Sequence, residues 1–153
     1  MAKILIVDDA FVIREKLRII LKKAGHEVVG EAGNGLQATL MYKRLQPDIV
    51  TMDITMPGIN GIDGLKRIRS HDENACVVMI SAMSQKAMVI EALEAGASGF
   101  ILKPFNNEKV LTVIEMVEAQ YLKGFEDSTD LKNQMKEMRE KKAGSDKKLT
   151  TMK

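Results

Sequence analysis

Five short apolar runs recur along the chain, and a segment with helical periodicity follows each of them. The runs lack the apolar–polar alternation of a half-exposed strand, so they indicate strands that are covered on both faces. Strands that alternate with helices favour βαβ units, a parallel sheet and helices on both of its faces. The expected strands are residues 3–7, 27–31, 48–53, 75–81 and 99–102, and the expected helices are residues 10–24, 34–45, 62–70, 85–95 and 107–122.

Apolar spacing predicts which side of each helix faces the core, and Asn34 is the expected cap of the second helix. The residues expected to point inward are Phe11, Leu17, Ile20 and Leu21, then Leu36, Leu40, Met41 and Leu45, then Ile62, Leu65 and Ile68, and finally Val110, Val113, Ile114 and Val117.

Polar groups follow the ends of four of the expected strands. Asp8 and Asp9 end the first apolar run, Asp53 ends the third, Ser81 ends the fourth, and Lys103 comes just past the fifth. The carboxyl ends of parallel strands meet at one edge of a sheet, where open α/β folds place their chemistry. We therefore expect these five side chains to meet around Asp53.

The three acids form a candidate cation site. Asp8, Asp9 and Asp53 would repel one another and raise their pKa values unless a cation lay among them. Mg²⁺ takes oxygen ligands and keeps several waters, so it suits carboxylates in a loop-lined cleft. Asp8 and Asp9 could instead cap the following helix, where negative charge is stabilised. The third acid, from a different strand, favours the metal site.

Lys103 and Ser81 extend the site towards phosphoryl chemistry. Lys103 precedes Pro104, and an X-Pro bond can be cis, so a bend could direct the ammonium over the strand ends to hold an anion. The alternative is an exposed surface lysine. Ser81 could donate to a phosphoryl oxygen or cap the next helix. Together the groups predict a site in which Mg²⁺ and Lys103 neutralise charge while Asp53 attacks as nucleophile, giving an aspartyl phosphate.

Four stretches resemble the receiver domains of response regulators, and in particular the chemotaxis members of that family. They are ILIVDDA (4–10), PDIVTMDITMPGINGIDG (47–64), MISAM (79–83) and EALEAGASGFILKPF (91–105). The resemblance covers residues 2–122 and implies a flavodoxin-like (βα)5 three-layer sandwich with a parallel five-stranded sheet of order 2-1-3-4-5. We expect a receiver domain at residues 1–123 and a charged C-terminal extension, part helix and part disordered, at residues 124–153.

The resemblance implies a role for each matching residue. Asp53 would be the phosphoacceptor, Asp9 would bind Mg²⁺ directly, Asp8 would bind it mostly through water, and Thr55 would offer its backbone carbonyl to the metal.

Two further residues would contact the phosphoryl group, and one would act as a switch. Ser81 and Lys103 would bind the phosphoryl oxygens, and Phe100 occupies the position of the family's aromatic switch residue. Phosphorylation would draw Ser81 inward and let Phe100 rotate into the space left. The surface formed by the last two helices and the strand between them would change, and a partner that prefers the changed surface would shift the population.

The expected function is that of a stand-alone response regulator of a two-component system. A histidine kinase of the chemotaxis type would phosphorylate Asp53, and the flagellar motor switch would read the change; a phosphatase is a further candidate partner. The alternative is a phosphorelay intermediate that passes the group to a histidine phosphotransfer protein. We do not expect an enzyme beyond self-phosphorylation and autodephosphorylation, because haloacid-dehalogenase-type phosphatases carry an acid where this chain has Thr55.

Charge, cysteine content and apolar runs indicate which partners and which compartment to expect. The net charge of +2 gives no reason to expect DNA binding, and one Cys fits a reducing compartment. No apolar run approaches the roughly 20 residues of a membrane span, and the first residues do not resemble a secretory signal. We expect a cytoplasmic monomer. Leu131, Met135 and Met138 form a narrow apolar seam in the extension, which could mediate association or lie in a solvated, partly disordered tail.

Overall fold

The computed structural model describes residues 1–82 and 86–123, and all structural statements concern these residues. Five parallel strands form one sheet in the order β2-β1-β3-β4-β5. The strands are β1 (Lys3–Val7), β2 (Glu27–Ala32), β3 (Ile49–Asp53), β4 (Val77–Ala82) and β5 (Gly99–Lys103). The helices are α1 (Phe11–Lys23), α2 (Gly35–Leu45), α3 (Gly61–His71), α4 (Lys86–Glu94) and α5 (Asn107–Val117), and a π-helix, Glu118–Lys123, follows α5.

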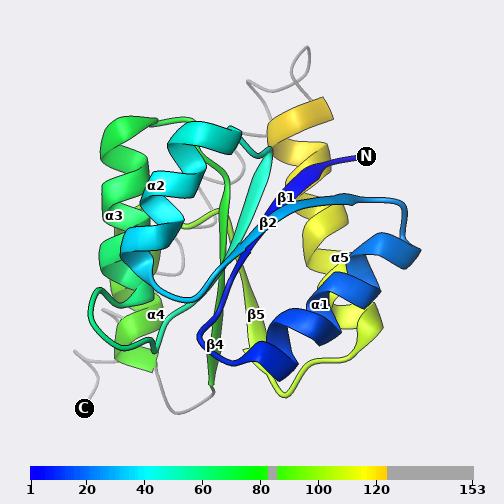
Figure 1. Ribbon diagram of the computed structural model, residues 1–153, viewed down its shortest axis with the longest axis horizontal. Helices are drawn as coiled ribbons and strands as arrows, with labels where there is room; N and C mark the ends of the chain where they lie inside the picture. The colour runs from blue at the N-terminus through cyan, green and yellow to red at the C-terminus, as the bar shows by residue number, and fades with distance from the viewer. Residues whose placement is uncertain (83–85, 124–153) are drawn as a thin grey trace, which may run out of the picture. The chain divides into compact units, whose positions relative to one another are not determined.

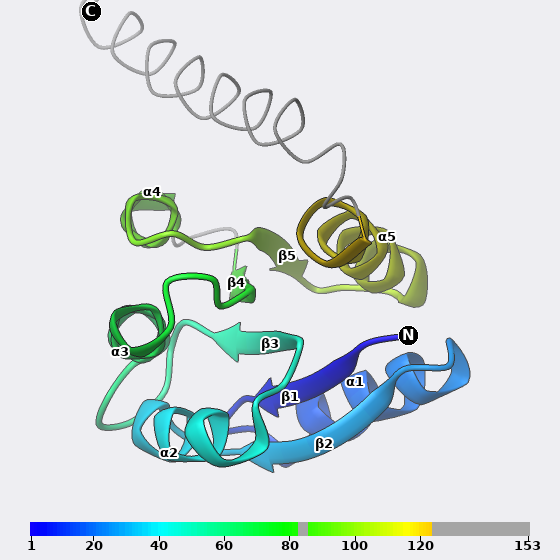
Figure 2. The ribbon, with the colours of Figure 1, turned by 90° about the horizontal axis from the view of Figure 1, so that it is seen from above.

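The elements form three layers, with the sheet in the middle (Figure 1). Helices α1 and α5 cover one face of the sheet, and α2, α3 and α4 cover the other (Figure 2). This arrangement confirms the flavodoxin-like fold and the strand order that the family resemblance implied. Residues 4–7 of β1 and 49–53 of β3 are buried throughout, as the unbroken apolar runs indicated.

The chain divides into two compact units, Met1–Val117 and Glu118–Lys153. The predicted boundary at residue 123 stays a prediction, and the expectations for residues 124–153 fall outside the described part of the chain. None of the helices in the described ranges is long and apolar enough to cross a membrane.

Helix α2 begins where expected, and two of its predicted core residues, Met41 and Leu45, are partly buried against the main apolar cluster, but the other two are not. The Asn34 side chain caps it by accepting a hydrogen bond from the Gln37 N–H at 2.9 Å. Leu36 and Leu40, expected inside, are 48% and 59% exposed. The buried positions are Gly35, Ala38, Thr39 and Tyr42. Small side chains let the helix backbone approach its neighbours closely, and the apolar leucines are turned outward as a result.

Phe11 is the second correction, because its side chain is 65% exposed rather than part of the core. It begins α1 at the edge of the sheet, where its ring lies 5.8 Å from the Arg14 guanidinium carbon. The other expected core residues of α1, Leu17, Ile20 and Leu21, are buried. In α3, Ile62, Leu65 and Ile68 are buried as expected.

Candidate functional site

Three carboxylates meet where β1 and β3 end. The two strands pair in parallel with Val7 opposite Met52, so Asp8, which follows β1, lies beside Asp53, the last residue of β3. One oxygen from each of Asp8, Asp9 and Asp53 lies within 4.8 Å of the others. Asp8 and Asp53 are buried, and Asp9 is exposed. The structure thus brings together the three acids that the sequence singled out.

The helix-capping alternative for these acids is wrong. Helix α1 has Ala10 as its N-cap residue and no side-chain cap. Asp8 instead accepts a hydrogen bond from the Ala10 N–H at 2.8 Å through Oδ1, which leaves Oδ2 directed elsewhere in the site. The carboxylates are therefore available as a group of hard oxygen donors, the ligand type that Mg²⁺ prefers.

Lys103 extends across the carboxylates from the end of β5. Its Nζ lies 3.2 Å from Asp53 Oδ1 and 3.4 Å from Asp8 Oδ2. The Lys103–Pro104 peptide bond is cis, the form that the sequence allowed at this position. The alternative of a solvated surface lysine is wrong, because one ammonium contacts two of the three acids.

The site carries more negative than positive charge, and the pKa values reflect this. Burial, followed by repulsion from Asp8, raises the pKa of Asp53 to about 6, although Lys103 acts in the opposite direction. Burial alone would lower the pKa of Lys103, but the Asp53 and Asp8 carboxylates outweigh it, and this pKa lies above its ordinary value. A divalent cation would relieve the excess negative charge, so the donor set fits Mg²⁺.

This electrostatic strain predicts an unusual pH dependence for the metal-free protein. The pKa of Asp53 is about 6 in the fold, against an ordinary value of 3.8, so its ionisation opposes folding, fully above pH 6 and less as the pH falls towards 4. We expect Asp53→Asn to raise the free energy of unfolding by about 2–3 kcal/mol at pH 8.

Urea denaturation in the presence of EDTA, from pH 5 to pH 8, measures this effect. The difference between Asp53→Asn and wild type should shrink as the pH is lowered, because protonation removes the same charge. If Asp53→Asn is no more stable than wild type at pH 8, ionisation of Asp53 does not destabilise the folded state, and this prediction is wrong.

Ser81 has a fully buried hydroxyl for which no hydrogen-bond partner exists among the described residues. It is the next-to-last residue of β4, which ends at Ala82, and it follows Ile80, which pairs with Asp53. Residues 83–85 fall outside the described ranges, so the alternative of Ser81 as a helix cap stays a prediction. A buried donor without an acceptor is costly, and an anion beside Asp53 would offer it one.

Phe100 shares a face of the sheet with Ser81. Met79 pairs with Phe100 and Ser81 pairs with Leu102, and paired or alternate residues of a sheet point to the same side. Phe100 is partly buried and packs against the main apolar cluster. Thr55 lies two residues beyond β3 and is exposed. The positions agree with the predicted roles, which themselves stay predictions.

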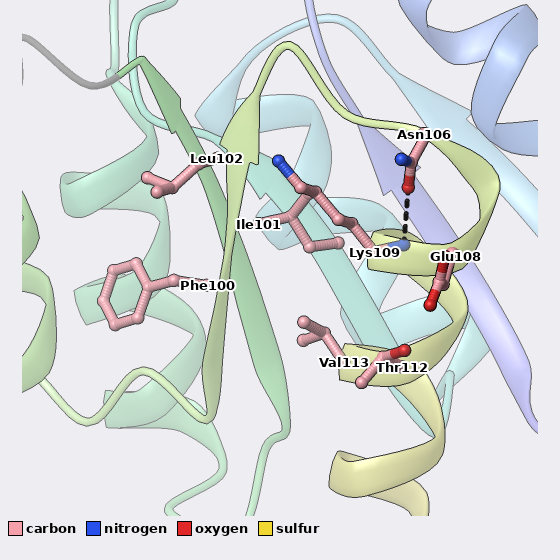
Figure 3. Close-up of a pocket in the computed structure, with 8 residues that line it drawn as sticks. All are labelled: Phe100, Ile101, Leu102, Asn106, Glu108, Lys109, Thr112 and Val113. Atoms are coloured by element: carbon pink, nitrogen blue, oxygen red, sulfur yellow. Dashed lines mark hydrogen bonds between the residues drawn. The ribbon is translucent and has the colours of Figure 1, made fainter.

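Phe100 also lines a pocket of about 460 Å³ between β5 and α5. In Figure 3 the Lys109 side chain runs from the first turn of α5 towards β5, and Val113 lies on the next turn. The Asn106 side chain accepts a hydrogen bond from the Lys109 N–H at 2.8 Å and so caps α5 (Figure 3). Figure 3 shows the Phe100 side chain on the other side of β5 from α5, whereas Ile101 lies on the α5 side.

Sequence reasoning missed two basic residues of α1 that contact the loops of the site. One Arg14 nitrogen donates to the Asp8 carbonyl at 2.6 Å, and Nε bonds Glu31 at 3.2 Å. Lys16 Nζ donates to the Phe105 carbonyl at 2.9 Å. Both acceptors beside the site are backbone carbonyls, which every residue possesses, so residue type alone gave no signal for these contacts.

Comparison with known proteins places this arrangement in context. Residues 4–115 match the family model described as response regulator receiver domain. The chain is 55% identical over 115 residues to the chemotaxis protein CheY of Thermotoga maritima, covering 75% of this chain and 96% of the relative. It is 54% identical over 112 residues to CheY of Bacillus subtilis, covering 73% and 93% of the two chains.

One similar solved structure contains BeF3 and Mg²⁺. The CheX–CheY complex of Borrelia burgdorferi with BeF3 and Mg²⁺ includes a chain that is 39% identical to this one. The match has a TM-score of 0.72 and covers 75% of this chain and 87% of that chain.

Proposed function

The chain belongs to the response regulator receiver domain family, and from this premise we propose that it is a stand-alone phospho-switch of a chemotaxis pathway, with Asp53 as phosphoacceptor. Receiver domains of the CheY type are signalling switches of two-component systems rather than conventional enzymes, and they bind Mg²⁺ at their acidic site. The observation that carries the proposal is the Lys103 ammonium held between Asp53 and Asp8, at 3.2 Å and 3.4 Å.

Each group of the site has a defined task in this proposal. Asp8, Asp9, Asp53 and the backbone carbonyl of Thr55 would hold Mg²⁺, which would supply positive charge beside the incoming phosphoryl group. The Asp53 carboxylate attacks phosphorus, the bond from phosphorus to the donor breaks, and the donor leaves with the electron pair. An ionised carboxylate needs no general base for this step.

Lys103 and Ser81 complete the binding of the transferred group. The Lys103 ammonium donates to one phosphoryl oxygen, and the buried Ser81 hydroxyl, which has no acceptor among the described residues, donates to another. When Ser81 moves towards the phosphoryl group, Phe100 on the same face of the sheet rotates inward. The surface around β5 and α5 then changes, and a partner that binds this form more tightly shifts the population.

The partners follow from the family. A histidine kinase supplies the phosphoryl group in the cytoplasm, and a flagellar motor switch protein reads the phosphorylated form. A partner of the CheX kind is a further candidate, since the CheY chain of Borrelia burgdorferi is found in complex with CheX. The alternative role is a phosphorelay intermediate, which would hand the group from Asp53 to a histidine phosphotransfer protein.

Acetyl phosphate tests the chemistry without a kinase. Wild-type protein incubated with acetyl phosphate and Mg²⁺ should gain the mass of one phosphoryl group, and proteolysis should place it on the peptide that contains Asp53. Excess EDTA should abolish the adduct. An adduct on another peptide, or one that forms equally well with EDTA, would contradict the proposal.

A second measurement separates the two signalling roles. A peptide from a flagellar motor switch protein should bind the phosphorylated form more tightly than the unphosphorylated form. Rapid transfer of the phosphoryl group to a histidine phosphotransfer protein, without phosphorylation-dependent peptide binding, would favour the phosphorelay alternative instead.

A further inference from the structure

Lys16 on α1 reaches the turn that follows β5, 89 residues later in the chain. Its Nζ donates to the Phe105 carbonyl at 2.9 Å and lies 4.8 Å from the centre of the Phe105 ring. One ammonium thus makes a charge-assisted hydrogen bond and a cation–π contact to the same residue. The Phe105 side chain is only 6% exposed, so the residue that Lys16 contacts is itself packed in place.

Phe105 is two residues from Lys103, and little freedom lies between them. The intervening Pro104 has its φ angle fixed by its ring. Before the turn, Lys103 pairs with Ala82 of β4, and after it, Asn106 caps α5. Lys16 adds a contact from α1 to the middle of this turn, between the strand pairing that precedes it and the helix cap that follows it.

We propose that Lys16 is a positioning residue for phosphoryl transfer, which fixes the turn after β5 so that the Lys103 ammonium stays directed at Asp53. Lys16 itself touches neither carboxylate in the described structure; its described polar contacts are to Phe105. The inference rests on the proposed function, because it assigns Lys16 an effect on that reaction.

Substitution of Lys16 should slow phosphorylation through Lys103 and leave the metal site alone. We expect Lys16→Met, which keeps an apolar stem of similar length, to lower the rate of phosphorylation by acetyl phosphate about fivefold. The affinity for Mg²⁺ should stay unchanged, since the metal would be held by acids that Lys16 does not contact. Lys16→Arg should recover most of the rate, because a guanidinium can also donate to the carbonyl and stack on the ring. Lys22→Met, at an exposed lysine near the end of the same helix, is the matched control.

A double-mutant cycle distinguishes positioning from a general structural role. In a Lys103→Met background, Lys16→Met should cause no further loss of rate, because the group that it positions is absent. An equal fivefold loss in both backgrounds would overturn the proposal, and so would an unchanged rate in Lys16→Met alone.

An NMR measurement keeps this inference separable from the proposed function. The ¹³Cε resonance of Lys103 in the unphosphorylated protein should shift, or lose signal to broadening, in Lys16→Met and not in Lys22→Met. A wild-type protein that accepts no phosphoryl group would overturn the proposed function, while this resonance would still report whether Lys16 holds Lys103. An unchanged resonance would overturn the positioning role, whatever the phosphorylation result.

Discussion

Asp53→Asn should accept no phosphoryl group from acetyl phosphate under conditions in which the wild-type protein is fully labelled. The amide that replaces the carboxylate is not a nucleophile, and loss of a nucleophile costs several orders of magnitude in rate, so we expect a decrease of at least about 10³-fold. Intact mass spectra taken over time give the fraction phosphorylated.

Unfolding of the variant would not explain the loss of phosphoryl labelling in Asp53→Asn. The same substitution should stabilise the metal-free fold at pH 8, because it removes a buried carboxylate whose pKa is raised to about 6. Asp63→Asn is the matched control, since Asp63 is an exposed acid in the first turn of α3. That variant should label like wild type. Labelling of Asp53→Asn at a comparable rate would mean that another side chain is the acceptor.

Gly61→Ala should destabilise the protein by about 3 kcal/mol or more, although alanine is a better helix former than glycine. A Cβ atom at this position would lie 1.9 Å from the Asp53 carbonyl oxygen and 2.9 Å from the Ile54 Cα. Both are backbone atoms, so no side chain can rotate away. The Gly61 N–H also donates to the Ile54 carbonyl at 2.8 Å, which ties the start of α3 to the end of β3.

Gly58→Ala is the control for this prediction. Gly58 has a φ angle of +74°, but nothing lies within 4 Å of the position that its Cβ would take. An alanine there should cost about 1–2 kcal/mol through backbone strain alone. Urea denaturation compares the stability of the two variants. If Gly61→Ala does not fold, its soluble yield and its hydrogen exchange are compared with those of Gly58→Ala instead. Equal midpoints for the two variants would show that the contact between Gly61 and Asp53 is not rigid.

Sequence patterns located the strands well because burial on both faces leaves a strong signal. Strand β1 has the predicted limits, and β3 ends at Asp53 as expected. Helix α2 shows where this reasoning failed. Leu36 and Leu40 looked like core residues, but small residues such as Gly35 and Ala38 determine which face packs, and spacing does not reveal this. Tyr42 is buried with them because its hydroxyl donates to Asp72 at 2.7 Å, a partner 30 residues away.

In the candidate site, too, some contacts could be predicted from the sequence and others could not. Parallel topology was enough to predict that Asp8, Asp53 and Lys103 meet, because each follows or ends a strand at one edge of the sheet. The contact between Lys16 and Phe105 could not be predicted, since its acceptor is a backbone carbonyl and its geometry depends on how α1 and the turn after β5 are packed.

Asp8 and Lys103, whose side chains meet in the finished site, are separated by 95 residues of chain. The acids at the ends of β1 and β3 come together once those strands pair, whereas the ammonium that offsets their charge arrives only when β5 joins the sheet. Contacts so distant in sequence close late and slow folding. A partly folded chain without β5 therefore carries unbalanced carboxylates, so divalent cations present during folding should speed assembly of the same edge that later serves signalling.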